Sequence, residues 1–322
     1  NLLRNFSVTP GFEVAVVCDL DPARLAKVCA PYPSVEQCGD LKTVLARGDI
    51  DAVAIATPVS THYPIAKAAL DAGKHVWVEK PLTDKLDQAE ELVELARSKG
   101  LVLMVDHTFV YTPAVRKMKE LLDAGNLGKL LYYDSVRINL GLFQHDVNVL
   151  WDLAVHDLAI LEFLLGTSPV SVSAHAISHL PGQHEDMAYM ICHYPDGIMA
   201  HLHLNWLSPL KIRRTIVGGD LRMLVYDDLE PSEKLKIYDR GADLRVASPE
   251  DIRKVNVDYR MGDMWAPHLA QTEALSTATK EFLSCIESGS NPVSNGEAGM
   301  RVVRILEAAG KSIHNHGAMV AL

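Results

Sequence analysis

The sequence of 322 residues lacks the patterns that mark several large classes of protein. Its five cysteines are scattered and odd in number, with no CxxC pair, so neither a disulfide framework nor a zinc site is indicated. No apolar run reaches the roughly 18 residues that cross a bilayer, and we see no signal peptide. Basic residues form no run and the net charge is −10, which argues against nucleic acid and membranes as partners. We therefore expect a cytoplasmic protein with reduced thiols and no metal.

The first third of the chain predicts a parallel sheet. Residues 1–107 alternate short apolar runs with helical patterns, as βαβ units do around a sheet buried on both faces. Asp21 and Pro22 suit the start of a helix. The other expected helices are Leu41–Arg47, Tyr63–Ala72 and Lys85–Ser98, and the expected strands are Glu13–Cys18, Ala52–Ala56, His75–Val78 and Leu101–Val105. We predict an α/β Rossmann domain with a parallel doubly wound sheet over residues 1–107.

After residue 107 the pattern changes to long alternating runs. Two of them carry hairpin turn residues, Pro195-Asp196-Gly197 and Gly218-Gly219-Asp220, which favours antiparallel pairing. The expected strands are Leu130–Asn139, Val170–Leu180, Met187–Trp206 and Ile212–Tyr226, and the expected helices are Pro113–Ala124, His268–Ser288 and Gly296–Ile313. We predict an α+β domain over residues 108–322, with a large, mostly antiparallel open sheet for substrate binding and oligomerisation.

Asp19 stands where a doubly wound sheet binds its ligand, outside the carboxyl end of a strand. An acid there accepts hydrogen bonds from the adenosine ribose; the alternative is a turn residue without a ligand. With no arginine beside it, Asp19 favours NAD over NADP, because a carboxylate repels a 2′-phosphate. The glycine fingerprint normally lies about 20 residues upstream, so we expect it and the first strand to be missing from the N-terminus, with 1–6 as the end of a helix.

Two segments carry a family resemblance. Thr57-Pro58 is followed by His62, and the run from Gly73 to Pro81 reads Gly-Lys-His-Val-Trp-Val-Glu-Lys-Pro. Together they closely resemble the Gfo/Idh/MocA oxidoreductases, and the resemblance extends over essentially the whole chain. It implies that Thr57, Pro58 and His62 line the cofactor pocket.

The same resemblance assigns roles to the Glu-Lys-Pro segment. Glu79 is implied to contact the nicotinamide ribose, and Lys80 to bind cofactor and reach the reacting sugar hydroxyl. A lysine at the mouth of a buried strand favours an alkoxide developing on the substrate; the alternative is a surface lysine. We add His107, after the last parallel strand, to the expected cofactor-binding residues.

The apolar run Val149–Leu161 predicts a buried helix with three ionisable residues. Asp152 and His156 are four apart and share a face, which suits a general base oriented by a carboxylate, or a purely structural pair. The resemblance places both toward the substrate, and we interpret Asp157 as structural. We expect His156 to remove the hydroxyl proton while Lys80 polarises the oxygen and hydride passes to NAD.

The segments from Arg137 to Asn148 and from Leu204 to Arg214 are similar to those of the UDP-N-acetylglucosamine 3-dehydrogenases and their uronic-acid relatives. This implies oxidation at C3 of a UDP-N-acetyl amino sugar or its uronate. We expect Tyr111 and Trp206 to offer sugar-stacking faces. The expected substrate-binding residues are Lys80, Tyr111, Arg137, Asn139, Asn148, Asp152, His156 and Arg213.

Two alternatives stay open. One is a dehydrogenase of a free cyclic polyol or simple sugar, of the inositol or glucose type. The other is a non-catalytic nucleotide-binding protein on the same scaffold, since fold does not fix function. His201 and His203 alternate on one strand, and we interpret them as sheet residues because no third metal ligand lies nearby. An open sheet is expected to bury its outer face against another copy, so we expect a homodimer or homotetramer.

Overall fold

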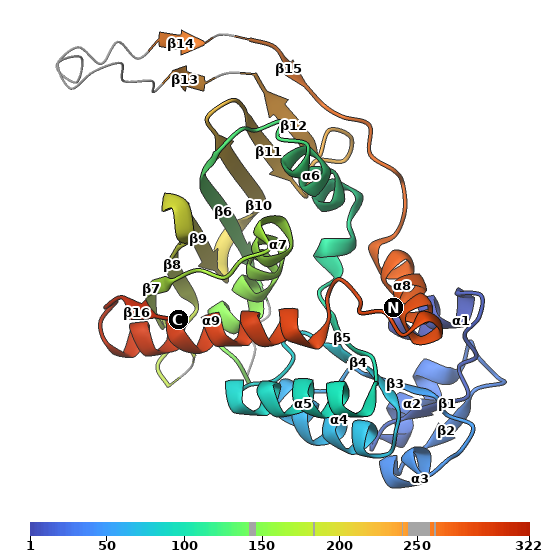
Figure 1. Ribbon diagram of the computed structural model, residues 1–322. Helices are drawn as coiled ribbons and strands as arrows, with labels where there is room; N and C mark the ends of the chain where they lie inside the picture. Colours follow the sequence, from blue (N-terminus) through green and yellow to red (C-terminus); the bar gives the residue numbers. More distant parts are fainter. Residues whose placement is uncertain (142–145, 183, 240, 244–257, 261) are drawn as a thin grey trace. The chain divides into compact units, whose positions relative to one another are not determined.

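The computed structural model describes residues 1–141, 146–182, 184–239, 241–243, 258–260 and 262–322 (Figure 1). They form two compact units. Unit 1 comprises Asn1–Tyr111 and Thr272–Val303, and unit 2 comprises Thr112–Gln271 and Arg304–Leu322. The segment Thr272–Val303 therefore folds with residues that lie far from it in the sequence. The predicted domain limits 1–107 and 108–322 stay a prediction. Within the described residues, no helix has both the length and the apolar character to cross a membrane.

Unit 1 is built on parallel strands, as expected from its apolar runs. One sheet has the order β3-β4-β5, and a second pairs β1 with β2, all in parallel. The strands are β1 (Val16–Cys18), β2 (Glu36–Cys38), β3 (Ala52–Ile55), β4 (His75–Glu79) and β5 (Leu103–Asp106). The helices are α1 (Leu2–Val8), α2 (Pro22–Cys29), α3 (Leu41–Leu45), α4 (His62–Asp71), α5 (Leu86–Lys99), α8 (Ala274–Ser288) and the 3₁₀ turns η1 (Val59–Thr61) and η2 (Thr108–Tyr111). The expected helix start after β1 is confirmed, since the Asp21 carboxylate caps α2 and Pro22 opens it.

An aromatic cluster fixes α1 and α8 to the sheet of unit 1. Trp77 of β4 is fully buried. Its ring makes edge-to-face contacts with Phe6 of α1 and Phe282 of α8, at centroid distances of 5.3 and 5.6 Å. Phe12 packs edge-on against Phe6 at 5.0 Å. Aromatic rings bury large apolar areas and favour this geometry, so the cluster holds elements from both ends of the chain together.

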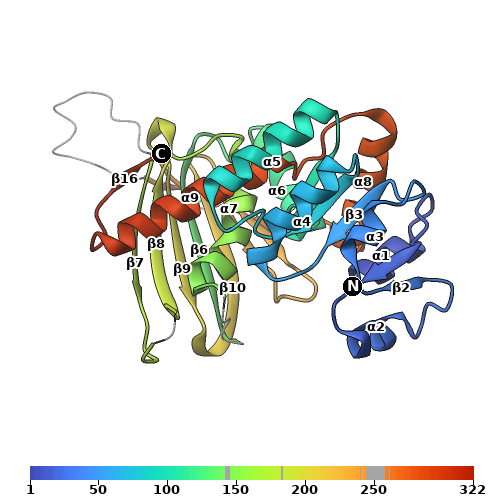
Figure 2. The same ribbon diagram turned by 90° about the horizontal axis from the view of Figure 1, so that it is seen from below.

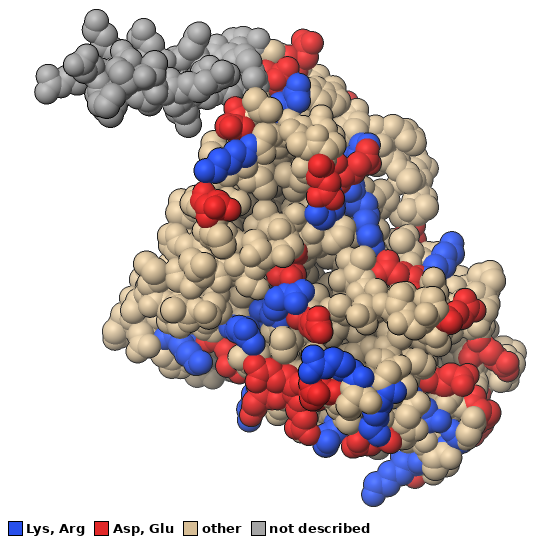
Figure 3. Space-filling view, viewed as in Figure 1, with Lys and Arg blue, Asp and Glu red and all other residues tan. Residues whose placement is uncertain are grey.

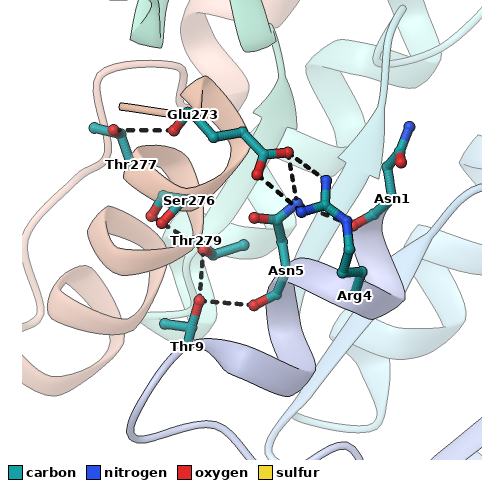
Figure 4. A network of polar contacts seen from close by, with 8 residues as sticks. All are labelled: Asn1, Arg4, Asn5, Thr9, Glu273, Ser276, Thr277 and Thr279. Carbon is teal, nitrogen blue, oxygen red and sulfur yellow. Dashed lines mark hydrogen bonds and ion pairs between the residues drawn. The ribbon is translucent and has the colours of Figure 1, made fainter. Parts of the chain in front are cut away.

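A polar network completes the packing of α1 against α8 (Figure 4). The Arg4 guanidinium donates two hydrogen bonds to the Glu273 carboxylate, and the Asn5 side-chain amide donates a third at 3.1 Å. Deeper in, Thr9 and Thr279 join their hydroxyls at 2.9 Å, and Thr9 also donates to the Asn5 carbonyl. The exposed ion pair and the buried hydroxyls together satisfy most of the polar groups at this contact.

The outer faces of α4 and α5 are polar and mixed in charge. Lys67 reaches Asp71 and Glu91, and Arg97 pairs with Glu94 one turn away. Figure 3 shows acidic and basic side chains interspersed over these two helices, in the lower part of the view. A mixed surface of this kind is a solvated helix face and gives no concentrated field that would attract a polyanion.

Unit 2 is built on one large mixed sheet (Figures 1 and 2). Among the described residues its strand order is β15-β12-β11-β10-β6-β9-β8-β7-β16, and every neighbouring pair is antiparallel except β6 with β9. The strands are β6 (Leu130–Leu140), β7 (Ser171–Ile177), β8 (Met187–His193), β9 (Met199–Asn205), β10 (Leu207–Gly219), β11 (Met223–Asp227), β12 (Leu235–Tyr238), β15 (Met264–Trp265) and β16 (Val320–Ala321). A separate pair joins β13 (Gly241–Asp243) to β14 (Asp258–Arg260). The predicted mostly antiparallel sheet is confirmed.

The helical elements of unit 2 are α6 (Pro113–Asp123), the π-helical turn η3 (Leu150–Ala154), α7 (Val155–Leu165), the turn η4 (Pro195–Gly197) and the end of α9 (Gly296–His314), which begins in unit 1. The predicted helix over Val149–Leu161 is thus half right, because its first turn is π-helical. The run Met187–Trp206 divides at η4 into the antiparallel strands β8 and β9, as its turn residues Pro195-Asp196-Gly197 predict. β2 was not predicted, because its three residues are polar or exposed.

Candidate functional site

The carboxyl ends of β3, β4 and β5 meet at one edge of the unit 1 sheet. The three strands are parallel and in register, so Ile55 lies beside Val78, and Glu79 beside Asp106. Thr57, Lys80 and His107 follow these strands directly. The structure therefore brings the predicted residues Thr57, Glu79, Lys80 and His107 to the edge at which doubly wound sheets bind their ligands.

His62 ties two turns of this edge together. Its ring is buried, with Nδ1 2.8 Å from the Pro81 carbonyl and Nε2 2.9 Å from the Thr57 carbonyl. Pro58, between Thr57 and the 3₁₀ turn η1, accepts a hydrogen bond from the Thr61 hydroxyl. The Lys80–Pro81 peptide bond is cis. Both His62 nitrogens are thus engaged by the backbone, so this residue shapes the edge, and its predicted contact with the cofactor stays a prediction.

Glu79 is a carboxyl group whose surroundings disfavour ionisation. Burial raises its pKa to about 7, the charge of Asp106 adds to the shift, and Lys80 offsets part of it. A carboxyl group that titrates near neutral pH beside a lysine is typical of sites that handle protons or bind hydroxyl groups.

Asp106 is a member of this edge that sequence reasoning missed. It ends β5 with only 3% of its surface exposed, and burial raises the pKa of its carboxyl group. The Thr108 hydroxyl donates to it at 2.7 Å. The available signal was its position, since an acid that ends an apolar strand next to the strand of Glu79 must share its edge.

His107 is buried with unused hydrogen-bonding capacity. Within the described part of the chain, neither ring nitrogen has a hydrogen-bond partner, although 98% of the residue's surface is covered. Burial, and then the charge of Lys80, lower its pKa to about 3, so the ring is neutral. Orphaned buried polar atoms are rare in native proteins. Such a nitrogen, at the ligand-binding edge of a parallel sheet, fits a bound polar group such as the amide or ribose of a nicotinamide cofactor.

Asp19 follows β1 and has a partner that we did not expect. Its carboxylate accepts hydrogen bonds from the Asp21 backbone N–H at 2.9 Å and from Arg24 at 3.2 Å. These contacts, the backbone bond first, lower the pKa of Asp19. The expectation that no arginine stands beside Asp19 is therefore wrong, because the first turn of α2 brings Arg24 back onto it. Asp19 itself is ionised and lies at a strand end, as a ribose-binding acid must.

In unit 2, the predicted residues Asp152 and His156 lie on consecutive turns. Asp152 is in the π-helical turn, and His156 is in the first turn of α7. Single π-helical turns within helices occur frequently at functional sites. The Trp206 indole N–H donates to the Asp152 carboxylate at 3.1 Å. Trp206 is only 1% exposed, so the expectation that it offers a face to a sugar is wrong; it orients Asp152 instead.

Arg137 and Asp157 form a fully buried ion pair in unit 2. Arg137 Nε and Nη2 donate to the two carboxylate oxygens at 2.8 and 3.0 Å, and both side chains are at most 3% exposed. The structural role that we expected for Asp157 is confirmed. Arg137 is committed to the same pair, and its predicted contact with substrate stays a prediction.

The remaining predicted substrate residues have protein partners. The Asn148 side chain accepts a hydrogen bond from the Trp151 backbone N–H, at the start of the helical segment that contains Asp152. It also donates a hydrogen bond to Glu185. Arg213 donates to Asp228 at 2.7 Å. Tyr111, in unit 1, is only 1% exposed with its hydroxyl bonded to Ser294 and Glu281, so the expectation that its ring offers a face to a sugar is wrong. Asn139 lies half-buried near the end of β6. Their roles toward a substrate stay predictions.

Two family models match the chain. Residues 1–107 match the oxidoreductase family with an NAD-binding Rossmann fold, and residues 115–225 match the C-terminal domain of the GFO/IDH/MocA group. These two segments lie in the parallel and in the mostly antiparallel part of the fold.

Curated relatives and solved structures agree with these matches. An uncharacterised oxidoreductase of Escherichia coli is 33% identical over 93% of this chain and 88% of its own length. The UDP-N-acetylglucosamine 3-dehydrogenase of Acidithiobacillus ferrooxidans is 30% identical over 90% of this chain and 87% of its own. A crystal structure of the latter enzyme superposes with a TM-score of 0.81, at 26% identity, over 98% of this chain and 93% of that one.

Proposed function

Because the chain belongs to the Gfo/Idh/MocA family of NAD-binding oxidoreductases, we propose that it oxidises a ring hydroxyl of a sugar, at C3 of a UDP-N-acetyl amino sugar or its uronate. The observation that carries the proposal is the strand-end edge of unit 1. It gathers Glu79, Lys80 and a buried His107 with unused nitrogens where an NAD-binding sheet holds its cofactor. The similarity to UDP-N-acetylglucosamine 3-dehydrogenase over 90% of the chain supports the substrate class.

The proposed chemistry assigns separate steps to Lys80 and to His156. NAD, when bound, supplies the acceptor for the hydride. Lys80 stabilises negative charge on the substrate oxygen, because a positively charged ammonium group attracts an alkoxide. His156 accepts the hydroxyl proton, and Asp152, which accepts a hydrogen bond from Trp206, stabilises the protonated imidazole four residues along the helix. Both assignments follow the family resemblance.

One observation favours a second candidate, a cyclic polyol. A scyllo-inositol 2-dehydrogenase of Bacillus subtilis is 29% identical over 66% of this chain. Two cations among the predicted substrate-binding residues, Arg137 and Arg213, are engaged by Asp157 and Asp228. A free inositol carries no diphosphate and requires no free cation.

A substrate screen separates the candidates. The purified protein is incubated with NAD⁺ and UDP-N-acetylglucosamine, its uronate, myo-inositol, scyllo-inositol or glucose, and NADH formation is followed by absorbance. We expect turnover with one of the nucleotide sugars and a kcat/KM at least about tenfold lower with free polyols. A preference for an inositol selects the second candidate. No turnover with any compound, together with saturable NADH binding, contradicts both substrate assignments.

We also propose that the outer face of the unit 2 sheet binds a second copy of the chain. Along β9 the buried Ala200, Leu202 and Leu204 alternate with the more accessible Met199 and the half-buried histidines of the same strand. On β8, Tyr189 stacks on His203 at 4.5 Å and is 42% exposed. Light scattering is expected to give a dimer or tetramer mass, and a monomer at all concentrations contradicts this part of the proposal.

A further inference from the structure

Two carboxyl groups lie side by side at the strand-end edge of unit 1. Glu79 ends β4 and Asp106 ends β5, and the two residues are register partners in a parallel pair. Neighbouring strands are about 4.8 Å apart, and register partners point to the same face of the sheet. Asp106 is 3% exposed and Glu79 is half-buried, so little water separates their charges from each other.

Such a pair cannot readily carry two negative charges at neutral pH. Two like charges in a poorly solvated place raise each other's affinity for a proton, and the pair then titrates as one coupled unit. The pKa shifts of the two carboxyl groups agree with this rule. Burial, and then the Asp106 charge, raise the pKa of Glu79 to about 7, while burial also raises the pKa of Asp106. The pair therefore exchanges a proton with solvent close to neutral pH.

We propose that Glu79 and Asp106 hold one proton between them when reduced cofactor is bound, and release it to solvent when oxidised cofactor binds. The inference rests on the proposed function, in which Glu79 contacts the nicotinamide ribose. The oxidised nicotinamide ring carries a positive charge, which favours the ionised carboxylate, whereas the reduced ring is neutral. Asp106 acts through Glu79 and is thus a positioning residue that sets the pH at which the proton leaves.

Few other groups around the pair can titrate in the same range. His107 is neutral, because burial and Lys80 lower its pKa to about 3. Lys80 carries a charge that favours the ionised form of Glu79. On the Asp106 side, the Thr108 hydroxyl and the Trp77 indole favour its ionised form. Measurements between pH 5.5 and 7.5 therefore follow the carboxyl pair.

The test compares the affinities of the two cofactor forms across this range. NADH binding is measured by fluorescence, and NAD⁺ binding by displacement of NADH. For the wild-type protein we expect the ratio of the NAD⁺ Kd to the NADH Kd to fall by about tenfold from pH 5.5 to 7.5. Calorimetry in two buffers of different ionisation enthalpy is expected to record proton release on NAD⁺ binding near pH 6.5.

Three variants test whether the pH dependence of the affinity ratio arises from the carboxyl pair, and a fourth is the control. Asp106→Asn removes the neighbouring charge and is expected to move the transition to lower pH. Thr108→Val removes the donor to Asp106 and is expected to move it to higher pH. Glu79→Gln is expected to make the ratio independent of pH, and Glu94→Gln, on the exposed face of α5, to leave it unchanged.

Each outcome has one meaning. A pH-independent ratio in the wild type, or the same transition in Asp106→Asn and Thr108→Val as in the wild type, overturns the inference. Circular dichroism of each variant confirms its fold, and the opposite shifts expected for the two variants cannot both arise from misfolding. If the wild type binds neither cofactor form, the proposed function itself fails, which is a different result from binding without pH dependence.

Discussion

Two buried charged clusters of this protein differ in how well they are paired. In unit 2, Arg137 and Asp157 satisfy each other through two hydrogen bonds in an interior that water does not reach. At the strand-end edge of unit 1, Glu79 and Asp106 instead place like charges together, and His107 has two nitrogens without a partner among the described residues. Opposite charges bonded to each other indicate a structural role, whereas like charges side by side at the ligand-binding edge of a parallel sheet indicate a place for a ligand. The comparison predicts that substitution of Asp157 mainly lowers stability. Substitution of the strand-end groups of unit 1 mainly changes cofactor binding and pH dependence.

The largest effect is expected on turnover. Lys80→Ala and His156→Ala are each expected to lower kcat by about 10²–10⁴-fold, because each removes a group that exchanges charge or a proton with substrate. Steady-state assays with the best substrate of the screen measure this, and unfolding curves close to wild type serve as the control. Near-normal turnover in either variant removes that residue from the chemical step.

Stability is expected to respond most in unit 2. Asp157→Asn leaves the Arg137 charge buried and incompletely paired, which costs about 3–5 kcal/mol of the free energy of unfolding. Asp227→Asn breaks the exposed pair with Arg214 and is expected to cost less than about 1 kcal/mol. Denaturant unfolding compares the two, and equal losses would mean that burial does not distinguish these ion pairs.

The strand-end edge is expected to make stability depend on pH. The pKa of Glu79 is raised from its ordinary value to about 7, so the folded state binds this proton more tightly than the unfolded state. The contribution to stability is therefore complete below about pH 4.5 and is lost as the pH rises toward 7. Unfolding free energies of wild type and Glu79→Gln are expected to differ in slope over this range, by on the order of 2 kcal/mol in total. Parallel curves would contradict the raised pKa.

A smaller effect is expected for the contact that orients Asp152. Trp206→Phe keeps an aromatic ring but removes the indole N–H that donates to the carboxylate. We expect kcat to fall about tenfold and the pH profile to shift, since the imidazole of His156 loses part of its charged partner. Trp151→Phe, at the neighbouring half-buried tryptophan, is the matched control. An unchanged pH profile would leave Trp206 with a packing role only.

Much of the fold follows from local patterns. The buried strands before Thr57 and Lys80 are continuous apolar runs, and Asp21 with Pro22 begins α2 as capping chemistry requires. β2 could not be predicted in this way, because Glu36 and Gln37 are polar and exposed and pair only through their backbone with β1. The π-helical turn at Leu150–Ala154 depends on tertiary packing and has no periodicity of its own.

Less of the candidate site than of the fold could be predicted from the sequence. Lys80 and His156 were predicted from motifs and their roles stay predictions, while the groups around them come from distant segments. Asp106 lies 27 positions after Glu79 and becomes its neighbour only through strand register. Trp206, between β9 and β10, was predicted to be accessible to a sugar. Its burial depends on tertiary packing, which the sequence pattern did not indicate.

The central claim is that the incompletely paired groups at the strand ends of unit 1 hold a nicotinamide cofactor. Fluorescence titration with NADH tests it most directly, in the wild type and in His107→Phe. The account predicts saturable binding of one NADH per chain, weakened about fivefold in the variant through the lost hydrogen bond. Absence of binding to the wild-type protein, or equal affinity of both proteins, would contradict it.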